Sequence, residues 1–230
     1  MARTVIVGDI HGCAPELDSL LDRLAFSDGD RLVAVGDLVA RGPDTSAVLA
    51  TLRRVGGRSV VGNHDQRLLD ARAARAQGER GPRLSPAHER VMARLSEQDW
   101  EDLAALPLSL ELPEHDAAVV HAGLVPGIPL QQQDPWVLLH VRTLRPDGTP
   151  SDRRDAQLWG EVYAGPTHVA FGHNAIDGLQ LHPYATGLDT GCVYGGKLSA
   201  LVLDAGEPVP PAAKRHIVSV DARKEYVPLK

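Results

Sequence analysis

The chain has 230 residues, of which 43% are hydrophobic and 23% are charged, and its formal net charge is −6. This length is ordinary for one α/β domain with a large core. The negative net charge argues against a global attraction to nucleic acid or to an anionic membrane. Two cysteines, Cys13 and Cys192, cannot form a disulfide framework, which is typical of a reducing compartment. No apolar run approaches the length of a membrane span, and residues 4–7 read as a first strand rather than as part of a signal peptide.

These properties lead us to expect a cytoplasmic protein that folds as a single domain over residues 1–230 and does not act on nucleic acid or membranes. Nothing in the sequence indicates its oligomeric state.

The first third of the chain alternates predicted strands and helices. Leucines at three- and four-residue spacing lie on one face of a helix expected at 14–24. Pro43 in a first helical turn, with Asp44 beside it, opens the next helix. The strands expected around these helices are 3–7, 31–35 and 59–61. Strand–helix–strand units of this length indicate a parallel, right-handed layer.

The middle of the chain, residues 66–106, is predicted to be helical and is rich in arginine. A break at 78–86 divides it, and Ser96 with Asp99 resembles a capping box. A solvated helix face explains these arginines more simply than an anion-binding surface does.

The rest of the chain contains mostly strands. The elements expected in order are strands at 108–112 and 117–121, a short helix at 134–142, a polar loop at 145–155, and strands at 167–171, 179–182, 185–188, 198–203 and 216–220. Parallel and antiparallel strands with helices outside them predict an α/β (α+β) fold, in which two mixed β-sheets pack as a sandwich flanked by helices.

Five polar clusters stand directly after apolar runs, each beside a glycine. They are GDIHG at 8–12, GDLVARG at 36–42, GNHD at 62–65, VHAG at 120–123 and GHN at 172–174. Taken singly, a Gly-Asp pair is commonly a turn and a lone histidine is commonly an ordinary buried residue. Five such clusters at strand ends are harder to explain in this way. The carboxyl ends of strands in an open sheet line one crevice, so the clusters predict a common site.

The side chains in these clusters are carboxylates, an amide and imidazoles. Oxygen and imidazole ligands together suit a first-row divalent ion such as manganese, iron, zinc or nickel. A carboxylate that bridges two such ions gives the two-metal clamp used for displacement at phosphorus. The sequence therefore predicts a metal-dependent phosphoesterase.

The order GDIHG, GDLVARGPDT, GNHD, VVHAG and FGHN resembles the calcineurin-like metallophosphoesterases, in the branch that holds the serine/threonine phosphatases. GDLVARGP and the later GLDTGC at 187–192 are similar to the symmetrical diadenosine tetraphosphate hydrolases. These motifs span most of the chain. The resemblance implies that residues 124–166 form a helical and loop segment that caps the substrate.

The resemblance also implies residue roles. The metal ligands would be Asp9 and His11 for one ion, Asp37 as the bridge, and Asn63, His121 and His173 for the other ion. The residues acting on substrate would be His64 as general acid or phosphate ligand, with Arg41, Asn63 and Arg142 binding phosphate. Arg145 is the alternative to Arg142. Two divalent ions, manganese or else cobalt, nickel, iron, zinc or magnesium, would hold the hydroxide that attacks phosphorus.

Ala40 departs from the phosphatase pattern, because phosphoprotein phosphatases have an aspartate there that supports the catalytic histidine. Without it we expect His64 to be a weaker and less firmly oriented acid. This loss matters least when a nucleoside diphosphate or a phenolate leaves as an anion. We therefore expect a dinucleoside polyphosphate substrate, with diadenosine tetraphosphate cut into two ADP.

Other functions stay open. Only about fifty residues separate His121 from His173, and so short a cap also fits a broad phosphatase acting on phosphorylated peptides or small molecules. Four aromatic residues, Trp136, Trp159, Tyr163 and Tyr194, could stack on adenine or could simply belong to the core or rim. A binding scaffold that has lost catalysis would be expected to lack some ligands, yet all six are present.

Overall fold

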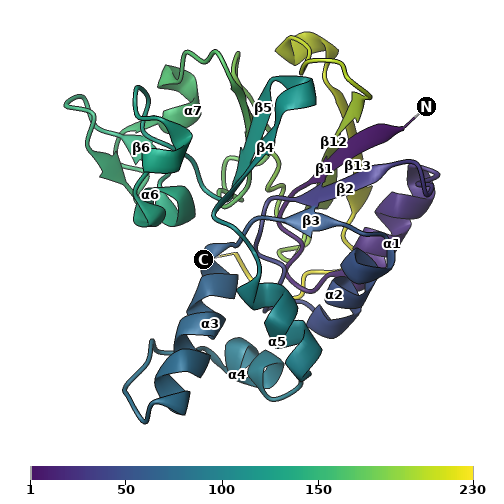
Figure 1. The fold of residues 1–230 in the computed structure, drawn as a ribbon, viewed down its shortest axis with the longest axis vertical. Helices are drawn as coiled ribbons and strands as arrows, with labels where there is room; N and C mark the ends of the chain where they lie inside the picture. The colour runs from purple at the N-terminus through teal and green to yellow at the C-terminus, as the bar shows by residue number, and fades with distance from the viewer. Residues whose placement is uncertain (1, 230) are drawn as a thin grey trace.

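Two five-stranded mixed sheets form the centre of the computed structural model, which describes residues 2–229 (Figure 1). The first sheet has the order β13 (His216–Asp221), β12 (Lys197–Asp204), β1 (Arg3–Val7), β2 (Arg31–Ala34) and β3 (Arg58–Ser59). The second has the order β10 (Gln180–Leu181), β11 (Ala185–Gly187), β9 (His168–Phe171), β5 (Ala117–Val120) and β4 (Ser109–Leu112). The predicted fold class, two mixed sheets with flanking helices, is confirmed.

The layers follow from the two-residue period of the strands. In β1, Val5 and Val7 face the helices, whereas Ile6 faces the second sheet. Between the sheets, Ile6 joins residues such as Leu201 of β12 and Val119 of β5 in one buried cluster. The two sheets therefore pack face to face over an apolar layer, as in a sandwich.

Helices cover the outer face of the first sheet and extend beyond its edge (Figure 1). They are α1 (Ala14–Arg23), α2 (Thr45–Arg54), α3 (Asn63–Ala76), α4 (Pro86–Met92) and α5 (Glu97–Ala104). The side chain of Asp44 caps α2 by accepting a hydrogen bond from the Ala47 amide at 2.9 Å. Pro43 therefore precedes the helix, and our prediction that it lies in the first helical turn is wrong. The capping box of Ser96 and Asp99 at α5 is confirmed.

The segment between β5 and β9 carries a small sheet and two short helices. Its elements are the 3-10 helix η2 (Leu130–Gln132), α6 (Pro135–His140), β6 (Thr143–Leu144), β7 (Pro150–Ser151), β8 (Gln157–Leu158) and α7 (Trp159–Val162). The short 3-10 helices η1 (Pro113–His115) and η3 (Ala212–Lys214) lie outside this segment. The predicted polar loop at 145–155 is wrong in part, because β7 pairs with β6 there. Val137 and Trp159 pack with Phe171 on the outer face of the second sheet. That this segment caps a substrate stays a prediction.

The parallel strands of both sheets end on the same side. β1, β2 and β3 are mutually parallel, and so are β5 and β9. β3 ends at Ser59 rather than at Val61 as predicted, since the Val61 amide donates instead to the Pro107 carbonyl at 2.8 Å. The strand ends direct the five motif loops toward one another.

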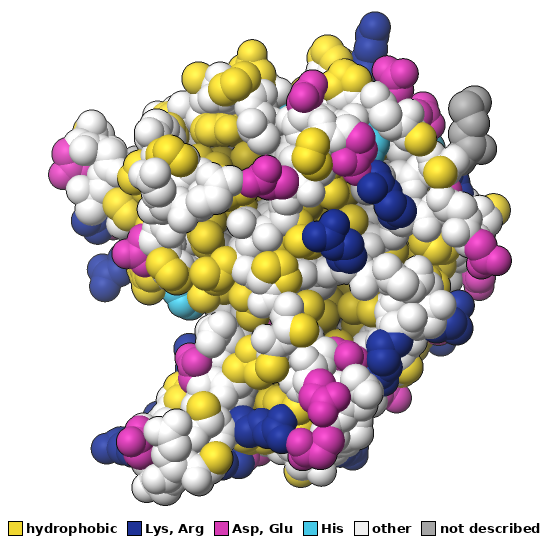
Figure 2. Space-filling model, in the orientation of Figure 1, with side chains coloured by type: hydrophobic (Ala, Val, Ile, Leu, Met, Phe, Trp, Pro, Cys, Tyr) yellow, Lys and Arg dark blue, Asp and Glu magenta, His cyan; other side chains and the backbone are white. Residues whose placement is uncertain are grey.

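The surface carries interspersed acidic and basic side chains, and it is hollowed between the helices α3–α5 and the part that carries α6 and α7 (Figure 2). No helix within residues 2–229 is both long enough and apolar enough to cross a membrane.

Candidate metal centre

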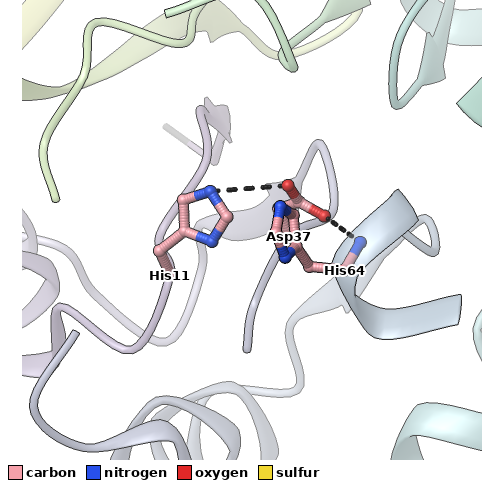
Figure 3. A group of neighbouring side chains, drawn as sticks. All are labelled: His11, Asp37 and His64. Atoms are coloured by element: carbon pink, nitrogen blue, oxygen red, sulfur yellow. Dashed lines mark hydrogen bonds and ion pairs between the residues drawn. The ribbon is translucent and has the colours of Figure 1, made fainter. Parts of the chain in front are cut away.

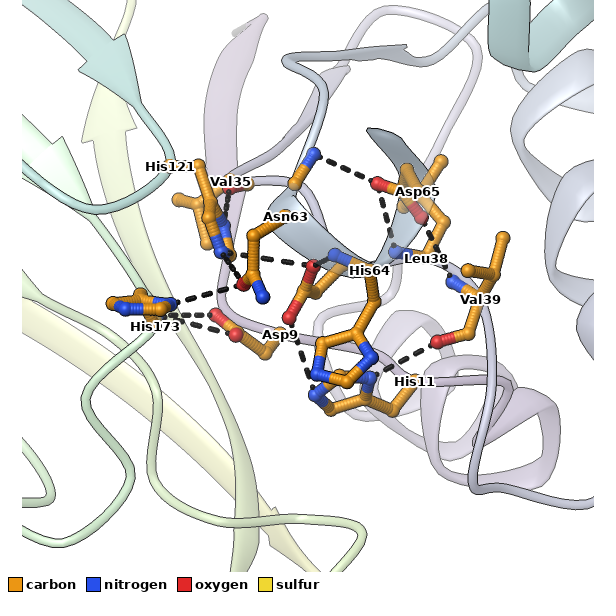
Figure 4. A network of polar contacts seen from close by, with 12 residues as sticks. Asp9, His11, Val35, Leu38, Val39, Asn63, His64, Asp65, His121 and His173 are labelled. Carbon is orange, nitrogen blue, oxygen red and sulfur yellow. Dashed lines mark hydrogen bonds and ion pairs between the residues drawn. The ribbon is translucent and has the colours of Figure 1, made fainter. Parts of the chain in front are cut away.

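The five motif loops converge on one buried cluster of polar side chains (Figure 4). Asp9 and His11 follow β1, Asp37 follows β2, Asn63 and His64 open α3 after β3, His121 follows β5, and His173 follows β9. Backbone hydrogen bonds tie the loops together, from the His11 amide to the Asp37 carbonyl at 2.7 Å and from the Gly172 amide to the His121 carbonyl at 2.8 Å. The structure thus brings together all six residues predicted to be metal ligands.

Two motif glycines let these loops approach closely. A Cβ atom on Gly172 would lie 1.8 Å from Asp9 Oδ1. A Cβ on Gly36, whose φ is +95°, would lie 2.7 Å from the Gly62 amide nitrogen. Neither distance is possible for a side chain, so glycine is required at both positions.

Several residues of the cluster have left-handed backbone conformations, which non-glycine residues rarely adopt. They are His11 (φ 48°), Asp37 (49°), Ala40 (67°), Arg41 (69°) and His173 (67°). Such conformations tend to gather at functional sites, where surrounding structure imposes them.

Asp37 is central to the geometry of the cluster. Its Oδ2 lies 3.4 Å from His11 Nε2 (Figure 3), and its Oδ1 lies 3.6 Å from His121 Nε2. Asn63 Oδ1 lies 2.9 Å from His121 Nε2 and 3.0 Å from His173 Nδ1. Asp37 therefore presents one carboxylate oxygen to each half of the cluster.

The positions of the protons on the rings of His11 and His121 favour a bound cation. His11 Nδ1–H donates to the Val39 carbonyl at 3.0 Å, and His121 Nδ1–H donates to the Val35 carbonyl at 2.9 Å. Burial lowers the pKa of His121 to about 4, so its neutral ring has no second proton to donate. Its Nε2 lone pair then faces the Asn63 oxygen, which is also an acceptor. Acceptors that converge in this way fit a metal ion between them, with the carbonyls orienting the rings from behind.

His173 supplies a second sign of the same kind. Its Nε2 is buried and has no hydrogen-bond partner among residues 2–229. A buried unpaired polar atom is costly in a folded protein unless something else satisfies it. The donor set of the cluster therefore fits a divalent metal centre.

The carboxylates of the cluster also indicate that it binds divalent cations. Burial raises the pKa of Asp37 to about 7 and that of Asp189 to about 6. Burial, followed by the charges of Asp189 and Asp37, raises the pKa of Asp9 well above its ordinary value. Divalent cations would offset the repulsion between these carboxylates. Asp189 is a site residue that our prediction missed, although the GLDTGC string that contains it was noted.

Asp65 was also missed, and its role is to hold two motif loops together. Its fully buried carboxylate accepts hydrogen bonds from the amides of Gly62 (2.8 Å), Val39 (3.1 Å) and Leu38 (3.4 Å). Its position as the last residue of GNHD was the one signal available in the sequence.

The predicted phosphate ligands differ in how near they come to the cluster. One nitrogen of Arg41 lies 2.7 Å from His64 Nε2, and the other lies 3.1 Å from His11 Nε2 and also donates to the Tyr194 hydroxyl. Arg142 is half-buried, and its charge lowers the pKa of Asp37, which burial raises.

Arg145, the alternative to Arg142, points elsewhere. It is exposed and pairs with Asp155 at 3.1 Å. The geometry therefore favours Arg142 of the two.

The ring of His64 is held by a histidine of another helix. Among the described residues 2–229 no carboxylate hydrogen-bonds this ring, but its Nδ1 is 2.8 Å from Nε2 of His88, whose own Nδ1 is 2.7 Å from the Ser85 hydroxyl. A buried histidine of α4 therefore supports the His64 ring, and the expectation that His64 is a weaker and less firmly oriented acid than in phosphoprotein phosphatases stays a prediction. No sequence motif marked His88.

Two of the aromatic candidates can now be separated. Trp159 is 1% exposed and donates to the Ala122 carbonyl at 2.9 Å, so it belongs to the core. Trp136 is 42% exposed and lies 5.8 Å from the ring of His140, which lies 6.3 Å from that of His173. Trp136 is therefore an open aromatic surface at the rim of the cluster.

A family profile described as calcineurin-like phosphoesterase matches residues 2–203. The chain belongs to this family. Calcineurin-like phosphoesterases use a binuclear centre of divalent metal ions, in agreement with the donor set described above.

Curated relatives of this phosphoesterase include both kinds of dinucleoside tetraphosphatase. A symmetrical bis(5'-nucleosyl)-tetraphosphatase from Janthinobacterium sp. (strain Marseille) is 31% identical, with 87% of this chain and 92% of the relative covered. An asymmetrical bis(5'-nucleosyl)-tetraphosphatase, PrpE of Halalkalibacterium halodurans, is 30% identical, with 93% and 95% covered.

Solved structures show the same fold. The crystal structure of a candidate diadenosine tetraphosphatase matches with a TM-score of 0.82 at 36% identity, covering 96% of this phosphoesterase and 93% of that chain. A serine/threonine phosphatase from Saccharomyces cerevisiae, at 17% identity and a TM-score of 0.65, shares the fold.

Proposed function

We propose that this phosphoesterase binds two divalent metal ions and cleaves diadenosine tetraphosphate symmetrically into two ADP. One ion would be held by Asp9, His11 and Asp37, and the other by Asp37, Asn63, His121 and His173. The observation that carries the metal assignment is the convergence of buried acceptor atoms, including the unpaired Nε2 of His173. Mixed oxygen and imidazole ligands suit a first-row divalent ion, and we propose manganese among these.

Such ions, when bound, lower the pKa of water and withdraw charge from phosphoryl oxygens. The chain's own residues would do the rest. Arg41, which projects from the second motif toward His64, would bind phosphate oxygens in a bidentate manner, and Arg142 would add a second positive charge near Asp37. His64 Nε2 faces the same space and would hydrogen-bond the phosphate or the leaving oxygen.

The substrate assignment rests on the leaving group. No carboxylate hydrogen-bonds the His64 ring within residues 2–229, and Ala40 stands where the phosphoprotein phosphatases have aspartate. ADP leaves readily as an anion, whereas a serine alkoxide needs a strong acid. The names of the curated relatives support the same substrate class, and most of those compared are called symmetrical.

A second function is a broad phosphatase that acts on aryl phosphates or phosphopeptides. The compact segment between β5 and β9, with its two-residue strands and short helices, favours it, because a small cap restricts large substrates less. Exposed Trp136 at the rim argues for the nucleotide, since a purine base needs an aromatic surface on which to stack.

Product analysis distinguishes these functions. The purified protein with Mn²⁺ should convert diadenosine tetraphosphate into two ADP, separated by anion-exchange chromatography, with a higher kcat/KM than it shows for phosphoserine or phosphotyrosine peptides. AMP with ATP as products would assign the asymmetrical reaction instead. Phosphopeptides hydrolysed faster than the dinucleotide would establish the phosphatase function.

A further inference from the structure

His64, His88 and Ser85 form a continuous chain of hydrogen bonds that leads from the site into the protein. The rings of His64 and His88 are nearly parallel, with an interplanar angle of 5° and centroids 5.0 Å apart. His88 is 5% exposed and lies in α4, whose N-terminus is capped by the Ser85 hydroxyl. The capping serine therefore also fixes the histidine that supports His64.

In the structure, the contact with Arg41 determines which nitrogen donates in each hydrogen bond of this series. Arg41 has only N–H donors, so His64 Nε2, 2.7 Å away, must accept with a lone pair. The single proton of a neutral His64 is then on Nδ1 and is donated to His88 Nε2 at 2.8 Å. His88 in turn carries its proton on Nδ1 and donates it to the Ser85 hydroxyl oxygen at 2.7 Å.

The same three residues also permit the opposite arrangement. A serine hydroxyl can donate as well as accept, and a neutral imidazole can carry its proton on either nitrogen. With Ser85 donating to His88 Nδ1, and His88 Nε2–H donating to His64 Nδ1, the proton of His64 stands on Nε2. A carboxylate behind His64 could only accept, and it would hold the His64 proton on Nδ1.

We propose that His88, fixed by Ser85, is a positioning residue that orients His64 and allows its neutral ring to offer Nε2–H to an oxygen of the substrate. This inference rests on the proposed function, since it requires that a phosphate oxygen or a leaving oxygen of the substrate takes the place of Arg41 Nη2 beside His64 Nε2. His64 then contributes a hydrogen bond, without transferring its proton to the leaving group. Such help is sufficient for leaving groups that depart as anions, such as ADP.

The kinetic test uses a series of aryl phosphates with the Mn²⁺-loaded enzyme. His88→Ala should lower kcat/KM for phenyl phosphate roughly tenfold more than for p-nitrophenyl phosphate, because only the poorer leaving group depends on the hydrogen bond. His88→Gln supplies an amide N–H near the position of Nε2 and should restore the ratio to within about threefold of wild type.

A matched control separates positioning from the docking of α4. Arg75 on α3 pairs with Glu89 on α4 at 2.7 Å and does not belong to the His64–His88–Ser85 chain. Arg75→Gln therefore loosens the same helix and should leave the dependence on leaving group unchanged. Equal losses on both substrates in His88→Ala, or no rescue in His88→Gln, would overturn the proposal.

A second readout does not depend on catalysis. In the metal-free protein, the proton on His64 Nδ1 should be hydrogen-bonded and slow to exchange, and ¹⁵N-edited NMR of the imidazole nitrogens should detect it. The signal should be lost in His88→Ala and kept in Arg75→Gln. An unchanged signal in His88→Ala would refute the pairing, whereas absence of activity on every phosphate ester with the signal present would refute the proposed function alone.

Discussion

Gly172 shows how a missing side chain can determine a metal site. The backbone at this position passes so close to Asp9 that a methyl group would overlap its Oδ1. The neighbouring His173 amide donates to both oxygens of the same carboxylate at 3.1 Å. Asp9 is therefore oriented by the loop that also carries His173, the proposed ligand of the other ion.

We expect Gly172→Ala to displace Asp9 and to lower kcat/KM on the order of 10²-fold while the protein stays folded. Steady-state kinetics with p-nitrophenyl phosphate and far-UV circular dichroism would measure the two effects. Gly29→Ala is the control, because a methyl group there meets no atom within 4 Å. Full activity in Gly172→Ala would contradict the close approach.

At the residue scale, the sequence predicted which candidate ligands would lie together but not the residues that support them. Asp9, Asp37 and His121 stand in short motifs after strands, and the strand ends bring them together. His88 carries no such signal, because its partner His64 is 24 residues away and belongs to a different helix. Contacts that arise only from the packing of two helices cannot be read from local patterns.

At the element scale, α6 presents Trp136 and His140 four residues apart, on the side facing His173. An exposed indole at the rim of a phosphate site is well placed for a nucleobase. Trp136→Ala should raise KM for diadenosine tetraphosphate roughly tenfold, since stacking on one base contributes about 1–3 kcal/mol. The KM for p-nitrophenyl phosphate should not change.

Tyr184→Ala is the control for the tryptophan variant, because Tyr184 is similarly exposed at 41% but packs on Gly165. Parallel increases in KM on both substrates would argue that α6 shapes the whole site rather than a base-binding surface.

The pairing of β1 with β2 begins at an ion pair that should make stability depend on pH. Arg3 Nε and its backbone amide both donate to Asp30 Oδ1, at 3.1 and 3.0 Å, and these bonds to Arg3 hold the pKa of Asp30 at about 2. A depressed carboxyl pKa stabilises the folded state above the unfolded pKa near 4, and this contribution fades as the pH falls toward 2.

Asp30→Asn should therefore lower the free energy of unfolding by about 2 kcal/mol at pH 7 and by much less at pH 2 to 3. Urea unfolding at both pH values would measure it. Asp28→Asn changes an exposed carboxylate in the same turn and should have little effect at either pH. A difference independent of pH would show that the ion pair does not set the pKa.

Element boundaries were predictable where a cap or a strong period marks them. Ser96 and Asp99 identified the start of α5, and the leucines of α1 identified its buried face. β7 was missed because Pro150–Ser151 is two residues long, and its pairing with Thr143–Leu144 follows from tertiary contacts rather than from composition.

At the scale of the whole molecule, the candidate site lies across the seam between the two sheets. Asp9 and Asp37 extend from the first sheet, whereas His121 and His173 extend from the second. The alternation of strands and helices predicted the parallel strands β1, β2 and β3, and the mixture of parallel and antiparallel strands with helices outside them predicted the sandwich. Ions held across the seam should stabilise the whole sandwich.

Removal of metal by a chelator should therefore lower Tm by several degrees, since a ligand at 100 times its Kd adds about 2.7 kcal/mol to the stability of the folded state. Asp37→Asn should no longer show this change in Tm on addition of a chelator. It should also lose turnover and the two bound ions, which plasma mass spectrometry would count. Asp70→Asn on the exposed face of α3 should behave as wild type. Two tightly bound ions in Asp37→Asn would refute the bridge.

The left-handed backbone at His11, Asp37, Ala40, Arg41 and His173 sets a limit on how this protein can be redesigned. Each such residue costs on the order of 1 kcal/mol, which a glycine would recover. A search for heat-resistant variants would thus find attractive substitutions among the side chains that we propose to hold metal and phosphate. Of the five positions, Ala40 alone offers that gain without the loss of a proposed ligand. Selection for heat resistance and selection for turnover should therefore agree at Ala40 and diverge at the other four positions.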